Sequence, residues 1–156
     1  MDLEISLRPI NDSDMSFLAE LYGSTRAEEM ELTGWPPEQI ESFLQMQFHA
    51  QHTYYQEHYG NSNFDVIMCG QEPIGRLYLQ RNKNEHRIVD IALIPQWRRK
   101  GIGAKMLGDI LKEAGGQGKA VGIHVEHNNP ALNLYKRLGF KKIADTGVYF
   151  HMEWNP

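Results

Sequence analysis

Residues 95–104, PQWRRKGIGA, combine the residue types that bind a phosphate. Three cations are consecutive at residues 98–100, and Gly101 and Gly103 let the backbone approach an anion without a Cβ in the way. An apolar run precedes the segment and an amphipathic run follows it. A strand therefore turns into a helix here, and the free amides of the first helical turn point at one place. We expect a pyrophosphate-binding turn. The alternative is that the glycines only relieve strain and the basic run is solvated surface.

The elements around this turn follow from hydrophobic periodicity. The apolar run 88–94, interrupted only by Asp90, predicts a central strand. Residues 101–114 have a helical apolar face that ends at Gly115 and Gly116. A strand at 120–126, a short helix around 131–138 and a last strand at 148–154 complete this half. The strand, helix and strand between residues 88 and 125 must form a parallel crossover.

The first half of the chain has a less regular pattern. Residues 3–8 alternate as a strand, and Asn11 or Ser13 can cap a helix that fades near Thr25. A second helix begins at Pro36 and Pro37 and extends to about residue 58, and a hairpin of two strands covers residues 63–80. The element order predicts an α/β fold with a mixed sheet of six to seven strands and about four helices, in a single domain over residues 1–156.

A second motif lies in NNPALNLYKRLGF, which begins at Asn128 and contains Ala131, Tyr135 and the pair Gly139-Phe140. This segment and the R-x-x-G-x-G spacing from Arg98 resemble the two signatures of the GNAT superfamily of N-acetyltransferases. Both motifs occur in the expected order and on the expected elements. The resemblance covers the C-terminal half of the chain, whereas the N-terminal half agrees through element order only.

This resemblance implies a GNAT-like acyl-CoA N-acyltransferase fold. It also implies an enzyme in which a primary amine directly attacks the thioester of acetyl-CoA, the co-substrate. Backbone groups of residues 91–94 would contact pantetheine, residues 98–104 the pyrophosphate, and Asn128 and Tyr135 the thioester end. The implied cofactor-binding residues are Ile91, Ala92, Leu93, Ile94, Arg98, Arg99, Lys100, Gly101, Ile102, Gly103, Ala104, Asn128 and Tyr135.

The resemblance also suggests catalytic roles. The backbone amide near Leu93 is the expected oxyanion donor, and Tyr135 is the expected general acid. The helical spacing of Tyr135 equally permits a tyrosine packed in the core. Many relatives carry a base, a glutamate, early in the central strand, where this chain has Arg87. Asp90 is the substitute we expect, although it can equally be a structural aspartate. Rival bases are Glu126, His124, Glu28, Glu29 and a water relay.

Composition limits the remaining function classes. A net charge of −4 argues against nucleic-acid or anionic-membrane partners, and a single cysteine fits a reducing compartment, so we expect a cytoplasmic protein. The N-terminal residues lack a signal-peptide pattern. His49 and His52 have loose metal spacing, but no accompanying cluster completes a site, so no metal is expected. A homodimer is a further expectation. A non-catalytic acetyl-CoA sensor or interaction module is the alternative function, and the acceptor amine is not identified.

Overall fold

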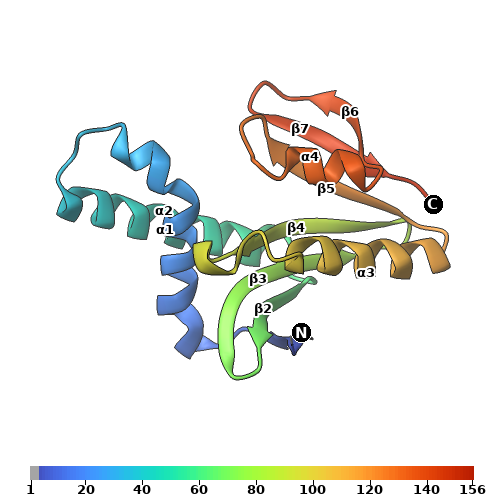
Figure 1. Ribbon diagram of the computed structural model, residues 1–156, viewed down its shortest axis with the longest axis horizontal. Helices are drawn as coiled ribbons and strands as arrows, with labels where there is room; N and C mark the ends of the chain where they lie inside the picture. Colours follow the sequence, from blue (N-terminus) through green and yellow to red (C-terminus); the bar gives the residue numbers. More distant parts are fainter. Residues whose placement is uncertain (1–3) are drawn as a thin grey trace. The chain divides into compact units, whose positions relative to one another are not determined.

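The computed structural model describes residues 4–156 (Figure 1). These residues form seven strands and four α-helices, so the predicted mixed α/β fold is confirmed. The strands are β1 Ile5–Pro9, β2 Asn63–Cys69, β3 Glu72–Arg81, β4 Glu85–Leu93, β5 Ala120–Glu126, β6 Lys141–Asp145 and β7 Tyr149–Trp154. The α-helices are α1 Met15–Glu31, α2 Pro37–His58, α3 Ile102–Gly116 and α4 Leu132–Arg137. Two 3-10 helices, η1 Asp12–Asp14 and η2 Pro95–Trp97, precede α1 and follow β4.

The described residues divide into two compact units. The first contains the chain up to Leu77 and the segment Ile91–Arg98, and the second contains Tyr78–Asp90 and Arg99–Pro156. Strands β3 and β4 continue from one unit into the other. A single domain over residues 1–156 therefore stays a prediction.

The sheet is mixed, with the strand order β1-β2-β3-β4-β5-β7-β6. β1 and β2 are antiparallel, as are β5 and β7, and β6 and β7. β4 and β5 are parallel, with Glu85 opposite Ala120 and Ile88 opposite Ile123. This parallel pair, with α3 between its strands in the sequence, confirms the predicted crossover.

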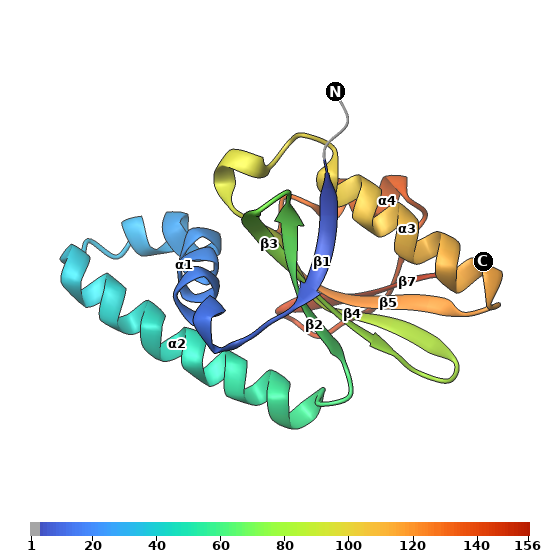
Figure 2. The ribbon, with the colours of Figure 1, turned by 90° about the horizontal axis from the view of Figure 1, so that it is seen from below.

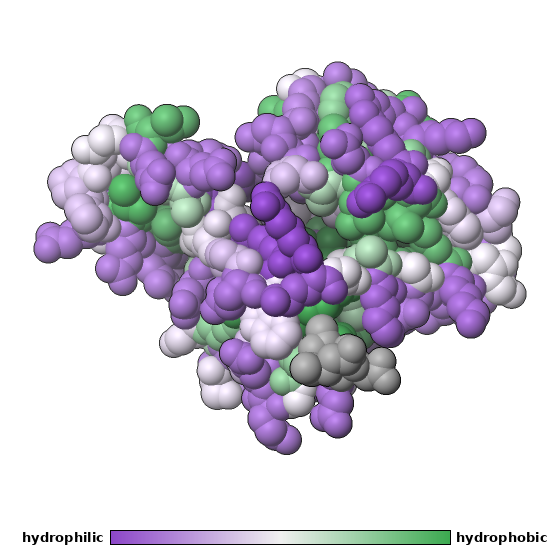
Figure 3. Space-filling view, in the orientation of Figure 1, coloured by the Kyte–Doolittle hydropathy of each residue, from purple (hydrophilic) through white to green (hydrophobic). Residues whose placement is uncertain are grey.

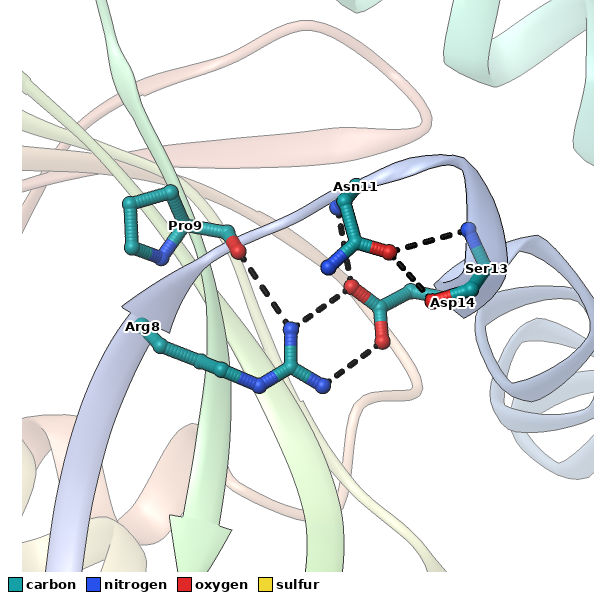
Figure 4. A network of polar contacts seen from close by, with 5 residues as sticks. All are labelled: Arg8, Pro9, Asn11, Ser13 and Asp14. Carbon is teal, nitrogen blue, oxygen red and sulfur yellow. Dashed lines mark hydrogen bonds and ion pairs between the residues drawn. The ribbon is translucent and has the colours of Figure 1, made fainter.

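A polar network connects β1 to α1 in the first unit (Figure 4). The Arg8 guanidinium donates to both carboxylate oxygens of Asp14, at 2.7 and 2.8 Å. The backbone amide of Asn11 donates to the same carboxylate at 2.9 Å. The Asn11 side chain accepts from the Ser13 amide, which completes a capping box. These contacts, chiefly the Arg8 bond, hold the pKa of the buried Asp14 carboxyl below its usual value.

Helices α1 and α2 pack against each other in the first unit (Figure 2). Leu18 and Tyr22 of α1 and Phe48 of α2 form their buried contact. α2 begins and ends as predicted, but α1 extends to Glu31, so the predicted end near Thr25 was wrong. Strong helix formers follow Thr25, and the Thr25 hydroxyl bonds the Tyr22 carbonyl of its own helix at 2.6 Å. The helix therefore continues past this residue.

On the face that Figure 3 shows, hydrophobic residues are exposed among hydrophilic ones over this helix pair. Leu32 after α1, Trp35 before α2 and Met46 within α2 are 89%, 38% and 61% exposed. None of the described helices is long and apolar enough to cross a membrane.

The first half of β3 and the end of β4 approach each other closely in the first unit. A Cβ at Gly75 would lie 2.3 Å from the Ala92 carbonyl oxygen and 2.9 Å from the Leu93 side chain. No side chain fits in that space, so glycine is required here. Nearby on the same strand, Arg76 is 3% exposed and donates to Gln51 of α2 at 2.8 Å.

The core of the second unit is built on the apolar face of α3. Its six buried residues are those that helical periodicity predicts, namely Ile102, Met106, Leu107, Ile110, Leu111 and Ala114. They are accompanied by buried β-strand residues, Val121, Ile123, Val125 and Met152. In the same unit, Nε2 of the fully buried His86 lies 2.6 Å from the Glu113 carboxylate of α3. Arg81 Nε pairs with the same carboxylate at 2.8 Å.

Candidate active site

The turn that opens α3 has an unusual backbone. Gly101 immediately precedes the helix in the left-handed region, with φ 81° and ψ 2°, and Arg99 has φ 61° although it is not a glycine. The first intrahelical bond is donated by the Lys105 amide to the Gly101 carbonyl at 3.0 Å. The preceding amides of the first turn have no intrahelical acceptor, and Gly101 has no side chain to cap them. These amides and the positive end of the helix dipole favour an anion in this position.

The exposed side chains of Arg99 and Lys100 belong to the same turn, whereas Arg98 belongs to the first unit. The Arg98 Nε donates to the Leu93 carbonyl at 2.9 Å, and its Nη2 donates to the Ser24 hydroxyl at 3.3 Å. The Arg98 guanidinium thus contacts protein groups on β4 and α1. No local sequence signal indicates Ser24, because it lies 74 residues from Arg98.

Residues 91–94, the predicted pantetheine contacts, are half-buried and lie at the end of β4. The Ile94 amide donates to the Ile74 carbonyl at 2.9 Å, so it is used by the sheet. In the second unit, the pairing of β4 with β5 ends at Ile88 and Ile123. Asp90 lies two residues beyond the last of these pairs.

Tyr135 of α4 is 3% exposed, and its ring contacts that of Phe140 edge-on at 5.7 Å between centroids. Burial, together with the negative charge of Asp90, raises the pKa of Tyr135 well above its usual value. The phenol therefore keeps its proton at neutral pH. The ring contact fits a packing role. The phenol has a proton to donate, but its raised pKa makes it a weaker acid than an ordinary tyrosine. Asn128, in the preceding turn, is exposed.

The other candidate bases are spread over both units. Arg87 Nη1 lies 3.0 Å from Nδ1 of His124 on the neighbouring strand. Burial, Arg87 and His151 lower the pKa of His124, so this ring is neutral at neutral pH. Glu28 and Glu29 lie on exposed turns of α1, because this helix continues past its predicted end near Thr25.

Around the second-unit candidates, several polar side chains form a group that sequence reasoning missed. The Glu85 carboxylate covers Gly122 in the space that a Cβ would fill and lies 3.8 Å from Arg87. The rings of His124 and His151 are 4.8 Å apart. Alternation along each strand places such residues on one face, but strand order and register are needed to bring them together. Within residues 4–156, no three His, Cys, Asp or Glu side chains are grouped so that they could hold a metal ion.

Known proteins resemble this chain in sequence and in fold. An N-alpha-acetyltransferase of Sulfurisphaera tokodaii is 41% identical over 66 residues, which cover 40% of this chain and 40% of that protein. The chain thus spans well under half the length of this curated relative. The PaiA N-acetyltransferase of Thermoplasma acidophilum, in complex with coenzyme A, has a TM-score of 0.72 at 20% identity, with 100% of both chains covered.

Arabidopsis thaliana Naa50, in complex with the bisubstrate analogue CoA-Ac-MVNAL, has a TM-score of 0.65 at 16% identity over 98% of this chain and 99% of that one. These two likenesses concern the fold. The family model described as the acetyltransferase (GNAT) family matches residues 25–140, more than half of the chain. This chain therefore belongs to the acetyltransferase (GNAT) family.

Proposed function

We propose that this protein transfers an acetyl group from acetyl-CoA to a primary amine of an acceptor by direct attack. The observation that carries the proposal is the left-handed backbone at Arg99 and Gly101, which leaves the first amides of α3 available to an anion. Membership of the acetyltransferase family supports the proposal that this anion is the pyrophosphate of acetyl-CoA.

Each unit supplies its own set of proposed coenzyme contacts. The residues in the first unit are Ile91, Ala92, Leu93, Ile94 and Arg98. The residues in the second unit are Arg99, Lys100, Gly101, Ile102, Gly103, Ala104, Asn128 and Tyr135. A Gly101→Val variant tests the turn, because a β-branched residue is strained at φ 81°. We expect weaker coenzyme A binding in isothermal titration calorimetry, with α3 still folded by circular dichroism.

The reaction needs a base, an oxyanion donor and an acid. The amine nitrogen bonds to the thioester carbonyl carbon after the base has removed its extra proton, and the carbonyl oxygen gains negative charge. The Leu93 amide is the proposed donor to that oxygen. The oxyanion then re-forms the carbonyl as the carbon–sulfur bond breaks, and Tyr135, which remains protonated at neutral pH, protonates the leaving thiolate. The nitrogen loses its second proton to solvent, which leaves a neutral amide, and Tyr135 takes a proton back from solvent.

Asp90 is our proposed base. Its carboxylate acts electrostatically on Tyr135, so a base and an acid of the second unit influence each other directly. His124, which is neutral at neutral pH, is the main rival. If Asp90→Asn keeps its fold and retains nearly full turnover across pH, Asp90 is not the base, and His124→Gln becomes the variant to measure.

The central experiment incubates the purified protein with acetyl-CoA and a mixed panel of amines and follows the release of free thiol. Release that depends on an amine supports the enzyme. Coenzyme binding without release from any amine supports the second candidate, a non-catalytic acetyl-CoA sensor. The observation that favours this candidate is Arg87, a cation bonded to His124 on a strand where many relatives carry a glutamate base.

Peptide α-amines deserve the first place in the panel. The curated relative is called an N-alpha-acetyltransferase, and Naa50 was crystallised with an analogue that joins coenzyme A to the peptide MVNAL. Free MVNAL, the same peptide with a blocked N-terminus, and small diamines separate an α-amine acceptor from other amines. Acetylation of the free peptide alone supports the peptide class, and acetylation of the diamines alone contradicts it.

A further inference from the structure

Arg98 has two hydrogen-bonded partners in the first unit, and both have a defined direction. Nε donates to the Leu93 carbonyl at 2.9 Å, and Nη2 donates to Ser24 Oγ at 3.3 Å. The Ser24 hydroxyl uses its only proton on the Leu21 carbonyl, at 2.7 Å. Its oxygen can therefore only accept from Arg98, and the chain of bonds extends from Arg98 through Ser24 into α1.

The same guanidinium helps to fix the last peptide group of β4. The peptide group between Leu93 and Ile94 has its carbonyl bound by Arg98 and its amide bound to the Ile74 carbonyl at 2.9 Å. Both polar ends of that peptide plane are therefore held. A peptide held at both ends cannot rotate without breaking a bond. The Leu93 amide belongs to the preceding peptide group, which is joined to this held plane at the Leu93 Cα.

A hollow of about 240 Å³ lies between α1 and the segment after β4. Its lining comes from α1, from the start of β3 and from the segment after β4, namely Phe17, Glu20, Ser24, Glu72, Pro73, Ile94, Pro95 and Gln96. Ser24 of α1 and Ile94 after β4 both line this hollow, and the Arg98 bond to Ser24 is a polar link between the two segments.

We propose that the Arg98 side chain is a positioning group that ties α1 to the end of β4 through Ser24 and the Leu93 carbonyl. We call these contacts the Arg98 clasp. The guanidinium does not supply a cation to the pyrophosphate, so the Arg98 contact with the coenzyme proposed above is one of its backbone. The idea concerns the same site as the proposed function and rests on it where catalysis is concerned, because Leu93 is the proposed oxyanion donor. The clasp itself can be tested without any reaction.

Arginine and lysine carry the same charge but differ in the geometry of their hydrogen-bond donors. The planar guanidinium of Arg98 presents several donors in a fixed arrangement, whereas a lysine ammonium offers the same charge without that arrangement. Arg98→Lys therefore keeps a phosphate-binding cation but loses the clasp. Ser24→Ala loses one arm of the clasp and changes no charge. Ser16→Ala, at an exposed position of the same helix, is the matched control.

The first measurement is hydrogen exchange of the protein without ligand, followed by mass spectrometry of peptides from residues 18–31 and 91–98. We expect Ser24→Ala and Arg98→Lys to speed exchange in both peptides by roughly two- to ten-fold, the change that loss of one hydrogen bond produces. Ser16→Ala should leave both peptides unchanged. Unchanged exchange in Ser24→Ala and Arg98→Lys would overturn the clasp, whether or not the protein proves to be an acetyltransferase.

The second measurement uses coenzyme A binding and turnover. We expect Ser24→Ala and Arg98→Lys to lower kcat to a similar extent, with no further loss in the double variant, and with coenzyme A affinity close to that of the parent. The salt dependence of coenzyme A binding should be the same in Arg98→Gln as in the parent. A normal Arg98→Lys together with a weakened, less salt-dependent Arg98→Gln would assign Arg98 to the phosphate and refute the proposal. Absence of turnover in the parent protein would refute the proposed function alone.

Discussion

The two units use different means to place their important groups. In the second unit the backbone sets the helix ends, as in the left-handed Gly101 before α3 and the left-handed Gly139 after α4, at φ 81° and 102°, and side-chain contacts such as that of Arg87 with His124 add to this. In the first unit, side chains far apart in sequence place these groups. Arg98 contacts Ser24, and Arg76 contacts Gln51. A left-handed backbone conformation restricts the residue type at that same position. A side-chain contact restricts the residue type at a position far away in the sequence.

The largest effect we expect falls on the chemistry assigned to the second unit. Tyr135→Phe should lower kcat by about 10²- to 10⁴-fold, since the variant has no proton to give to the thiolate. Coenzyme A affinity and Tm should change little, because the ring contact with Phe140 is kept. Steady-state kinetics and a thermal melt measure the two effects. A fall in Tm with unchanged kcat would make Tyr135 a packing residue only.

Replacing one glycine in each unit by alanine compares the room that the two backbones leave for a Cβ atom. Gly75→Ala in the first unit should lower the free energy of unfolding by about 3 kcal/mol, because the new Cβ would meet the Ala92 carbonyl. Gly108→Ala in α3 meets no atom within 4 Å and should raise stability by about 0.5–1 kcal/mol. Urea denaturation measures both changes. Equal effects at the two positions would contradict the close approach of β3 and β4.

The side-chain network at the start of α1 should have a smaller effect that depends on pH. Arg8→Gln leaves the buried Asp14 carboxylate without its cation and should cost about 2 kcal/mol of stability at pH 7.

The folded-state pKa of Asp14 is lowered, so its stabilising contribution is present above the unfolded pKa near 4. That contribution is lost as the pH falls through the folded value. The difference between Arg8→Gln and the parent should therefore narrow at low pH in a series of urea titrations. A difference that stays constant from pH 7 to pH 3 would show that Asp14 is not the group involved.

The smallest expected effect is electrostatic and belongs to the second unit. Asp90→Asn removes a negative charge that helps to hold the pKa of Tyr135 up, so Tyr135 should ionise at lower pH in the variant. Burial is the larger cause, and the pKa should remain above its usual value. Ultraviolet absorbance of phenolate during alkaline titration, with Tyr135→Phe as the blank, measures the shift. An unchanged pKa of Tyr135 in Asp90→Asn would show that Asp90 does not act on the proposed acid.

What the sequence could predict follows the same division. The buried face of α3, the parallel crossover and the glycine turn before α3 depend on local periodicity or on a backbone demand, and all three could be predicted. The end of α1 could not, since Thr25 bonds within its own helix and stays helical. The partner of Arg98 could not either, because nothing near residue 24 or residue 98 indicates a contact across the intervening chain.

The buried Arg76 has a consequence for the chain before it folds. In its strand, EPIGRLYLQR, Arg76 lies between Ile74 and the apolar residues 77–79, and short apolar β-forming stretches can pair with copies of themselves. A charge in the middle of such a run opposes intermolecular stacking, and so we expect Arg76 to keep the newly made strand soluble. Gln51, its hydrogen-bond partner, precedes it in the chain and has left the ribosome first. The group that protects the strand during synthesis can thus be buried as soon as the strand meets α2.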